Sequence, residues 1–305
     1  MNVLITQEID ESGVALLDDA GLTVQIYDEP QPIPRAILLE MVRGCDALIS
    51  MPTDSIDAEV MDTGPIQIVA QHAVGYDNID LDAARTRGVV VTNTPGVLTA
   101  ATADLTMGLL LALGRRLIEA DAYARAGNFP GWRPTLLRGV DLDGAQLGIV
   151  GMGRIGRAVA HRAEAFGMSV VHHSRSGGIP LDALLETSDV VSLHCPLTPE
   201  TRHLIDAAAL ERMKPSALLI NTARGPVVDE DALAAALEEG RIAGAALDVF
   251  EHEPLIHLSL LELDNVVLAP HIGSATWKTR RRMATLAAQN LLAFASGEPP
   301  PNQVS

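Results

Sequence analysis

The sequence lacks most of the features that mark secreted, metal-binding or membrane-spanning proteins. Its only two cysteines, Cys45 and Cys195, lie far apart without a CxxC or Cys/His pattern, so neither a disulfide framework nor a zinc site is expected. No apolar run reaches the ~20 residues that span a bilayer. The first residues, MNVLITQEID, also lack a basic region followed by an apolar core. These absences predict a cytoplasmic protein with no membrane partner and no bound metal.

Positive charge is scarce as well. The 22 Lys and Arg residues stand against 39 Asp and Glu, which gives a formal net charge of -17. A field of this sign repels nucleic acid, so any anionic ligand must be held by local arginines or by helix amino termini. The 48% hydrophobic content describes a folded chain with sizeable cores, and 305 residues are enough for two domains of roughly 100–200 residues each.

Short apolar runs alternate with amphipathic segments along most of the chain, which predicts parallel sheets covered on both faces by helices. The expected strands are Val3–Thr6, Val24–Tyr27, Ala47–Ser50, Ile66–Ala70 and Val89–Thr92, then, in a second series from Gln146, Val170–His173, Val190–His194, Ala217–Asn221, Ala245–Val249 and Val266–Ala269. The expected helices between and after them are Ser12–Asp19, Arg35–Val42, Ala58–Met61, Leu81–Arg87, Asp182–Glu186, Ala207–Arg212, Glu230–Glu239 and Thr276–Ala295. The fold class is therefore α/β, with doubly wound parallel sheets.

One long helix is expected over Thr99–Arg125, because leucines recur every four residues from Leu105 to Leu117. So wide an apolar surface predicts burial against more than one partner. The following segment, GNFPGWRPTLLRG, is rich in glycine and proline and contains Trp132. It predicts an extended stretch that is either a surface loop or an arm that contacts another copy of the chain.

The central motif is QLGIVGMGRIGRAV, residues 146–159, which predicts a strand, a tight turn and a helix. Gly151 allows the sharp turn, Gly153 allows the backbone to touch a pyrophosphate, and Gly156 allows the helix to sit close to the strand. The N–H groups at the helix start favour an anion. This segment therefore predicts a dinucleotide site.

The residues after the next expected strand bear on the choice of dinucleotide. An acidic residue about 20 positions after the glycines would bind the ribose 2′-hydroxyl of NAD. Here Ser174, Arg175 and Ser176 occupy that place, without a carboxylate. Because a guanidinium holds a 2′-phosphate that a carboxylate would repel, NADP(H) is preferred, with NAD(H) possible.

Three further strands end in chemically useful residues. Arg224, Glu253 and His271 each follow an expected strand, at the edge where ligands of open α/β sheets bind. Arg224 is a fixed cation, His271 can exchange a proton near neutral pH, and Glu253 can orient that imidazole.

With these motifs, the sequence resembles the D-isomer specific 2-hydroxyacid dehydrogenase family, and more narrowly its glyoxylate/hydroxypyruvate reductase branch. The resemblance covers essentially the whole chain. The resemblance rests on the segments AVGYDNID (73–80), TPGVLTAATADLTMGLLLA (94–112), GIVGMGRIGRAVA (148–160), SLHCPLTPETRHLI (192–205), NTARGPVVDE (221–230), LDVFEHEP (247–254) and APHIGSAT (269–276).

The resemblance implies hydride transfer from NAD(P)H to a small 2-oxoacid, glyoxylate or hydroxypyruvate, with Arg224, Glu253 and His271 as the catalytic set. It implies a substrate domain of residues 1–97 plus 274–305, into which a dinucleotide-binding domain of residues 98–273 is inserted, and a homodimer built with an arm at about 120–140. The implied coenzyme contacts are Thr102, Gly151, Gly153, Arg154, Ile155, Gly156, Ser174, Arg175, Cys195, Pro196, Thr201, Thr222, Arg224, Asp248, His271 and Gly273. The implied substrate contacts are Met51, Val74, Gly75, Arg224, His271, Ser274 and, from a neighbouring copy, Trp132.

Two alternatives stay open at this point. One is an NAD-dependent D-3-phosphoglycerate or other D-2-hydroxyacid dehydrogenase, against which the Ser174-Arg175 pair argues. The other is a nucleotide-sensing corepressor, a binding protein rather than an enzyme. The acidic chain has no appended interaction segment, which disfavours this alternative. His72 differs from the other histidines outside the catalytic set, because it lies beside the implied substrate turn.

Overall fold

A computed structural model describes residues 1–304. The chain divides into two compact units. Unit 1 combines Met1–Leu98 with the segment from Ser274 onward, and unit 2 is Thr99–Gly273.

Unit 1 is built on a five-stranded parallel sheet in the order β2-β1-β3-β4-β5. The strands are β1 (Asn2–Ile5), β2 (Thr23–Ile26), β3 (Ala47–Ser50), β4 (Ile68–Gln71) and β5 (Val90–Thr92). The helices are α1 (Glu11–Asp19), α2 (Arg35–Met41), α3 (Ala58–Thr63), α4 (Leu81–Arg87) and α12 (Trp277–Ala295), with a 3-10 turn at Val42–Gly44. All residues of β3 and β4 are buried, as expected for central strands covered on both faces.

Small residues bring α12 and α1 together on one face of this sheet. A Cβ atom on Gly13 of α1 would lie 2.8 Å from the carbonyl oxygen of Ala284 of α12, so only glycine permits this approach. Ala284, Ala287 and Ala288 are fully buried against the sheet. The last helix of the chain is therefore an integral part of unit 1.

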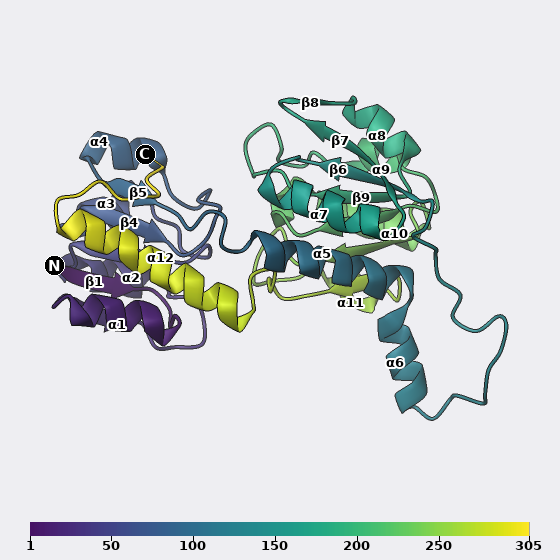
Figure 1. Ribbon diagram of the computed structural model, residues 1–305, viewed down its shortest axis with the longest axis horizontal. Coiled ribbons are helices and arrows are strands. Elements are labelled where there is room, and N and C mark those ends of the chain that lie inside the picture. The colour runs from purple at the N-terminus through teal and green to yellow at the C-terminus, as the bar shows by residue number, and fades with distance from the viewer. Residues whose placement is uncertain (305) are drawn as a thin grey trace. The chain divides into compact units, whose positions relative to one another are not determined.

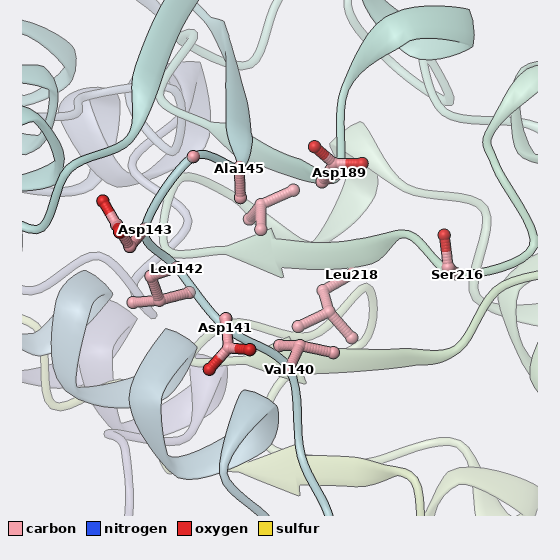
Figure 2. A pocket seen from close by; sticks show the side chains of 10 residues that line it. Val140, Asp141, Leu142, Asp143, Ala145, Asp189, Ser216 and Leu218 are labelled. Carbon is pink, nitrogen blue, oxygen red and sulfur yellow. The ribbon is translucent and has the colours of Figure 1, made fainter.

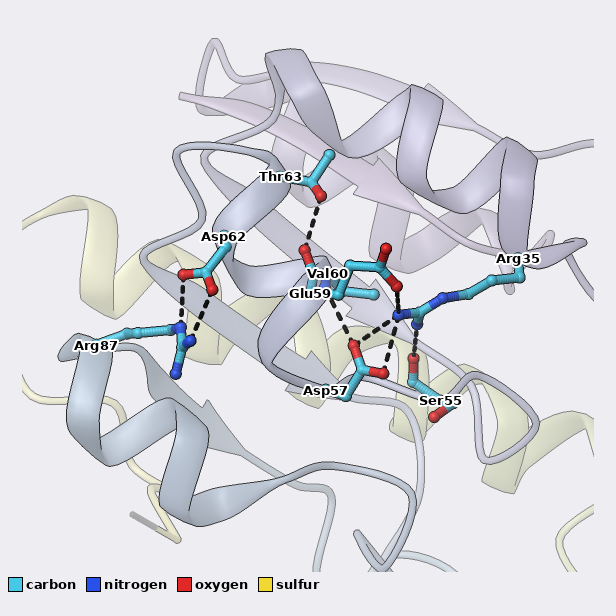
Figure 3. A network of polar contacts seen from close by, with 8 residues as sticks. All are labelled: Arg35, Ser55, Asp57, Glu59, Val60, Asp62, Thr63 and Arg87. Atoms are coloured by element: carbon cyan, nitrogen blue, oxygen red, sulfur yellow. Dashed lines mark hydrogen bonds and ion pairs between the residues drawn. The ribbon is translucent and has the colours of Figure 1, made fainter.

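A polar network crosses the other helices of unit 1 (Figure 3). Arg35 pairs with Asp57 at 2.7 Å and with Glu59 at 2.6 Å, and Arg87 pairs with Asp62 at 2.6 Å. These pairs are partly exposed, and such pairs contribute only about 0–1 kcal/mol each. They fix how α2, α3 and α4 meet, whereas the buried apolar side chains supply most of the stability.

Unit 2 is built on a seven-stranded sheet in the order β12-β11-β10-β9-β6-β7-β8, parallel except for β8. The strands are β6 (Gln146–Val150), β7 (Ser169–Ser174), β8 (Gly177–Gly178), β9 (Val190–Leu193), β10 (Leu218–Asn221), β11 (Gly244–Leu247) and β12 (Val266–Leu268). The helices are α5 (Thr99–Gly114), α6 (Leu117–Arg125), α7 (Arg154–Ala165), α8 (Leu181–Thr187), α9 (Ala207–Arg212), α10 (Glu230–Glu238) and α11 (Leu258–Glu262), with a 3-10 turn at Gly225–Val227. The strand order reverses between β6 and β9, and in such sheets the ligand crevice lies at the carboxyl ends of the two strands flanking that point.

The predicted α/β class with parallel sheets is confirmed, and most strand bounds differ from the prediction by one or two residues. The prediction missed two short elements, β8 and α11. The expected single helix over Thr99–Arg125 is wrong, because the structure breaks it into α5 and α6. Arg116 adopts a left-handed conformation with φ 52° at the break. The carbonyl of Gly114 accepts a hydrogen bond from the amide of Val140 at 2.8 Å, so a distant segment satisfies the end of α5.

Helix α5 and helix α6 have opposite environments. Leu109, Leu110 and Leu113 of α5 are buried against the sheet, whereas no residue of α6 is buried. Helix α6 and the loop after it extend away from the sheet of unit 2 (Figure 1). Trp132 in that loop is 85% exposed, and Leu117, Ile118 and Phe129 are more than half exposed. This excursion therefore presents an apolar surface that its own chain does not cover.

Candidate active site

The glycine turn between β6 and α7 has the three local properties that the sequence predicts for it. Gly151 has φ 99°, and a Cβ atom there would lie 2.6 Å from the amide nitrogen of Cys195. A Cβ on Gly156 would lie 2.2 Å from the carbonyl oxygen of Gly151, so this glycine lets α7 pack on the turn. Gly153 is different, since nothing lies within 4 Å of the place its Cβ would take. The turn thus leaves open space at the amino end of α7, where Arg154 and Ile155 begin the helix. The free N–H groups of a helix amino terminus favour an anion.

Strand β7 ends at Ser174, on the other side of β6 from β9. The Ser174 hydroxyl donates to the carbonyl oxygen of Gly177 at 3.0 Å and lies 3.2 Å from the hydroxyl of Ser176. Arg175 is exposed. A hydrogen bond from Thr198 is the main reason the pKa of Glu200 lies below its usual value, and the charge of Arg175 adds to the effect. The Arg175 guanidinium is therefore available to a ligand, with one carboxylate in electrostatic contact.

The loop after β9 faces the glycine turn. Within it, Thr201 donates a hydrogen bond to the carbonyl oxygen of Pro196 at 2.7 Å and accepts one from the Thr198 amide at 2.8 Å, which fixes the loop conformation. Burial raises the pKa of Cys195 to about 11, so its thiol stays protonated at neutral pH. Cys195 is therefore not a nucleophile at neutral pH.

The loop after β10 is held by the last residue of that strand. The Asn221 side chain donates to the carbonyl oxygen of Arg224 at 2.9 Å and accepts from the amide of Ala223 at 3.0 Å. Thr222, between them, hydrogen-bonds through its hydroxyl to that of Thr106 on α5 at 2.9 Å. Arg224 donates to the carbonyl oxygen of Ala223 at 2.9 Å. The backbone that presents the Arg224 guanidinium is therefore fixed from two sides.

Asp248, the first residue after β11, holds the loop after β12. Its carboxylate accepts hydrogen bonds from the amides of Ile272 at 2.7 Å and Gly273 at 2.8 Å, and its own carbonyl oxygen accepts from the amide of His271. Thr102 of α5 donates to the carbonyl oxygen of Gly273 at 3.2 Å. Burial raises the pKa of Asp248 despite these hydrogen bonds. The turn at His271, whose φ is 54°, is thus fixed by its neighbours rather than by its own preference.

Glu253 and His271 form a hydrogen-bonded pair. The Nδ1 atom of His271 lies 2.8 Å from Oε2 of Glu253, and the amide of Phe250 donates to Oε1 of the same carboxylate at 3.0 Å. Burial raises the pKa of Glu253, but the hydrogen bond and charge of His271, together with Phe250 and the charge of Arg224, outweigh it and keep the pKa below its usual value. Glu253 is therefore a carboxylate at neutral pH. With Nδ1 bound to Glu253, Nε2 on the opposite side of the ring is the atom that can exchange a proton with a substrate.

The predicted substrate residues of unit 1 lie at the carboxyl ends of its strands. Met51 follows β3, and its amide donates to the buried carboxylate of Asp54 at 2.7 Å. The turn at Val74 and Gly75 follows β4; Asn93 donates to the carbonyl oxygen of Val74 at 2.7 Å and Gln71 to that of Gly75 at 3.3 Å. Ser274 begins the returning segment of this unit.

His72, which precedes the substrate turn, is a core residue. Burial lowers its pKa to about 4, and the charge of Arg280 acts in the same direction. Its Nε2 atom has no hydrogen-bond partner among residues 1–304. His72 is therefore neutral at pH 7 and is no general acid there.

A hollow of about 330 Å³ lies at the opposite edge of the unit 2 sheet, and Figure 2 shows the side chains that line it. Ala145, Asp189 and Ser216 in its wall come just before β6, β9 and β10, so it opens at the amino ends of the strands. None of the predicted site residues lines it. Ligand chemistry in sheets of this kind belongs to the carboxyl edge instead.

Sequence reasoning missed several residues that hold the site together. Asn221 and Thr106 frame the Arg224 loop, and Gly225 brings that loop against the one that carries Glu253. A Cβ atom on Gly225 would lie 1.9 Å from the carbonyl carbon of Phe250. The one available signal was the position of Asn221 and Gly225 directly beside predicted site residues.

Comparison with known proteins shows the class to which this chain belongs. Residues 107–273 match the family model described as D-isomer specific 2-hydroxyacid dehydrogenase, NAD binding domain. The chain is 50% identical to a glyoxylate reductase of Thermococcus litoralis over 319 residues, covering 99% of this chain and 96% of that one. A solved protein of Thermus thermophilus is 50% identical, with a TM-score of 0.96 and full coverage of both chains. The NADPH-dependent glyoxylate/hydroxypyruvate reductase of Sinorhizobium meliloti, solved with NADP and malonate, is 34% identical with a TM-score of 0.87, covering 100% of this chain and 96% of that one.

The fold and these similarities together define an NAD(P)-dependent dehydrogenase. The chain belongs to the D-isomer specific 2-hydroxyacid dehydrogenase family, which confirms the predicted family and the predicted enzyme class. No helix within residues 1–304 is long and apolar enough to cross a membrane.

Proposed function

We propose that this protein reduces glyoxylate or hydroxypyruvate to the corresponding 2-hydroxyacid with a nicotinamide coenzyme. The observation that carries the proposal is the hydrogen-bonded pair of Glu253 and His271, on the same sheet edge as Arg224 and the glycine turn. The relatives named as glyoxylate reductases support the substrate class, since they are about half identical over almost the whole chain. Unit 2 would bind the coenzyme, and unit 1 would supply the Val74 and Gly75 amides for the substrate carboxylate.

In this mechanism Arg224 binds the carboxylate and carbonyl oxygens of the 2-oxoacid, which fixes the carbonyl carbon for attack. The coenzyme, when bound along the glycine turn, supplies the hydride. His271 gives the proton from Nε2 to the carbonyl oxygen, which becomes the hydroxyl group. Glu253 stays ionised and stabilises the imidazolium before transfer, because its carboxylate holds Nδ1 at 2.8 Å.

A spectrophotometric panel tests the function. We expect glyoxylate and hydroxypyruvate to be turned over with NADPH faster than 3-phosphohydroxypyruvate or larger 2-oxoacids. Preferred turnover of 3-phosphohydroxypyruvate with NADH would support the phosphoglycerate dehydrogenase alternative. Coenzyme binding without turnover of any 2-oxoacid would support a nucleotide-sensing binding protein.

We further propose that NADPH is the preferred coenzyme. Ser174 and Arg175 stand at the end of β7, where the ribose of a dinucleotide lies in folds of this type, and no carboxylate replaces them. The exposed Arg175 can form a charge-assisted hydrogen bond to a 2′-phosphate. The NADPH-dependent relative from Sinorhizobium meliloti supports this choice.

Arg175→Ala is expected to weaken NADPH binding by about 10-fold or more, the scale of one lost hydrogen bond between charged groups. Its affinity for NADH should stay unchanged, because NADH has no 2′-phosphate. Coenzyme fluorescence titrations measure both dissociation constants. Arg241→Ala, which removes an arginine that pairs with Glu211 and Glu239 in the same unit, serves as the control. Equal weakening of NADPH and NADH would identify Arg175 as a structural residue instead.

We also propose a homodimer in which α6 and the loop through Trp132 contact the second copy. The supporting observation is the exposure of Leu117, Ile118, Phe129 and Trp132 on one excursion of the chain. Apolar side chains gathered in this way are typical of subunit interfaces. Sedimentation of the purified protein measures the association state.

A further inference from the structure

Glu251 is a nearly buried carboxylate for which the proposed reaction gives no role. Its side chain is 9% exposed and lies two residues before Glu253, in the loop after β11. The Nε2 atom of His203 lies 2.5 Å from its Oε1 atom, and Arg202 donates to the same oxygen at 3.2 Å. A carboxylate with so little exposure requires such partners, since an unpaired buried charge is costly.

The other side of Glu251 is held by the start of α10. Its amide donates to Oε1 of Glu230 at 2.7 Å, and the amide of Glu230 points to Oε2 of Glu251 at 3.4 Å. Burial raises the pKa of Glu230, and repulsion from the Glu251 carboxylate adds to this shift. The hydrogen bond from the Glu251 amide, which is the larger of the two Glu251 effects, opposes the shift, as do His257 and His252. Two further carboxylates pair with histidines nearby: Asp229 lies 3.9 Å from Nδ1 of His203, and Asp231 pairs with His257. Glu251 is therefore held between the loop that contains Arg202 and His203 and the start of α10.

These contacts connect three loops of the site edge. His203 has φ 50°, and its amide donates to the carbonyl oxygen of Pro226 in the turn just after Arg224. Gly225 in that same turn packs directly on the backbone of Phe250 and Glu251. The amide of Phe250 in turn donates to Glu253. A displacement of Glu251 would therefore reach Glu253 through a backbone only three residues long.

We propose that Glu251 is a positioning residue: held by His203 and Arg202 on one side and by the start of α10 on the other, it fixes the loop that keeps Glu253 on Nδ1 of His271. This inference rests on the proposed function, in which Glu253 and His271 transfer the proton. Glu251 itself touches neither substrate nor coenzyme in this role. It acts through the geometry of the Glu253–His271 pair.

The test compares Glu251→Ala and Glu251→Gln with the wild-type enzyme in single-turnover oxidation of NADPH by glyoxylate. We expect Glu251→Ala to slow the reaction by about 10- to 100-fold, since a displacement near 1 Å costs up to about that much. Glu251→Gln keeps an oxygen that can accept from His203, so it should recover part of the rate. The NADPH dissociation constant, measured by fluorescence, should not change.

A double-mutant cycle separates this role from simple destabilisation. If Glu251 acts through Glu253, adding Glu251→Gln or Glu251→Ala to Glu253→Gln should cause little further loss of rate. The Glu253→Gln substitution has already removed the carboxylate that Glu251 positions. Asp231→Asn is the matched control. Asp231 also lies at the start of α10, but its side chain is largely exposed and pairs with His257. The Asp231→Asn enzyme should therefore react at the wild-type rate. The Gln variant keeps the test decisive if the Ala variant fails to fold.

The outcomes are distinct. Wild-type rates in correctly folded Glu251 variants, or losses that multiply with those of Glu253→Gln, would overturn the inference while leaving the proposed function intact. If none of the 2-oxoacids supported oxidation of NADPH by the wild-type protein, the proposed function would be overturned, and the inference with it. Glu251 is established as a positioning residue if Glu251→Ala slows the reaction, Glu251→Gln restores part of the rate, and neither loss adds to that of Glu253→Gln.

Discussion

His271→Asn is expected to lower the rate of 2-oxoacid reduction by about 100-fold or more, the usual scale for loss of a general acid. The substitution suits this position because the φ of His271 is 54°, a left-handed conformation that asparagine adopts more easily than most residues. The backbone that Asp248 holds through the amides of Ile272 and Gly273 should therefore survive. Only the proton donor and its hydrogen bond to Glu253 are lost.

The measurement is the kcat for glyoxylate with saturating NADPH, together with the NADPH dissociation constant. Coenzyme affinity should stay close to that of the wild type, since the glycine turn and Arg175 are untouched. His161→Gln, a change at an exposed histidine of α7, provides the control and should retain activity. Near-normal turnover of His271→Asn would show that another group donates the proton.

The second large effect is expected from Gly225→Ala. The added methyl group would lie 1.9 Å from the carbonyl carbon and oxygen of Phe250, so two loop backbones must separate. We expect a loss of about 1–3 kcal/mol in the free energy of unfolding, the range for overpacking a tight site. We also expect a fall in kcat of up to ~100-fold, because the loops that carry Arg224 and Glu253 move apart.

Gly108→Ala is the matched control for this prediction. Gly108 lies in α5 of the same unit, and nothing lies within 4 Å of the place its Cβ would take. Alanine there should stabilise the protein by roughly 0.5–1 kcal/mol, since glycine is a poor helix former. Denaturant unfolding and steady-state kinetics on both variants measure the two effects. If Gly225→Ala were as stable and active as Gly108→Ala, the close contact of the two loops would be refuted.

The parts of this molecule that were predictable from sequence are those encoded locally. Buried parallel strands such as Ala47–Ser50 appear as short apolar runs, and the turn at Gly151, Gly153 and Gly156 has a fixed spacing. The family followed from many such segments together and is confirmed. The roles of Arg224, Glu253 and His271 stay predictions, although the structure places Glu253 and His271 in hydrogen-bond contact across 18 positions of sequence.

The rest was not predictable because it depends on contacts between distant residues. Thr106 and Thr222 are 116 positions apart in the sequence and form a hydrogen bond, and so do His203 and Glu251, which are 48 positions apart. No spacing pattern in the sequence predicts either pair. The break between α5 and α6 has the same origin. The leucine pattern continues through it, but the amide of Val140 takes the carbonyl oxygen of Gly114, an acceptor that a continuous helix would use internally.

The hydrogen bond between Val140 and Gly114 makes the excursion a self-contained insertion in unit 2. It closes the base of the excursion that contains α6 and Trp132, so the chain leaves the body of unit 2 and returns to it at neighbouring points. A segment that starts and ends at one place can change its length, its apolar side chains and even its binding partner while the strands beneath keep their register. Changes in the length or the apolar side chains of this excursion should therefore leave the chemistry at the far edge of the sheet unaffected.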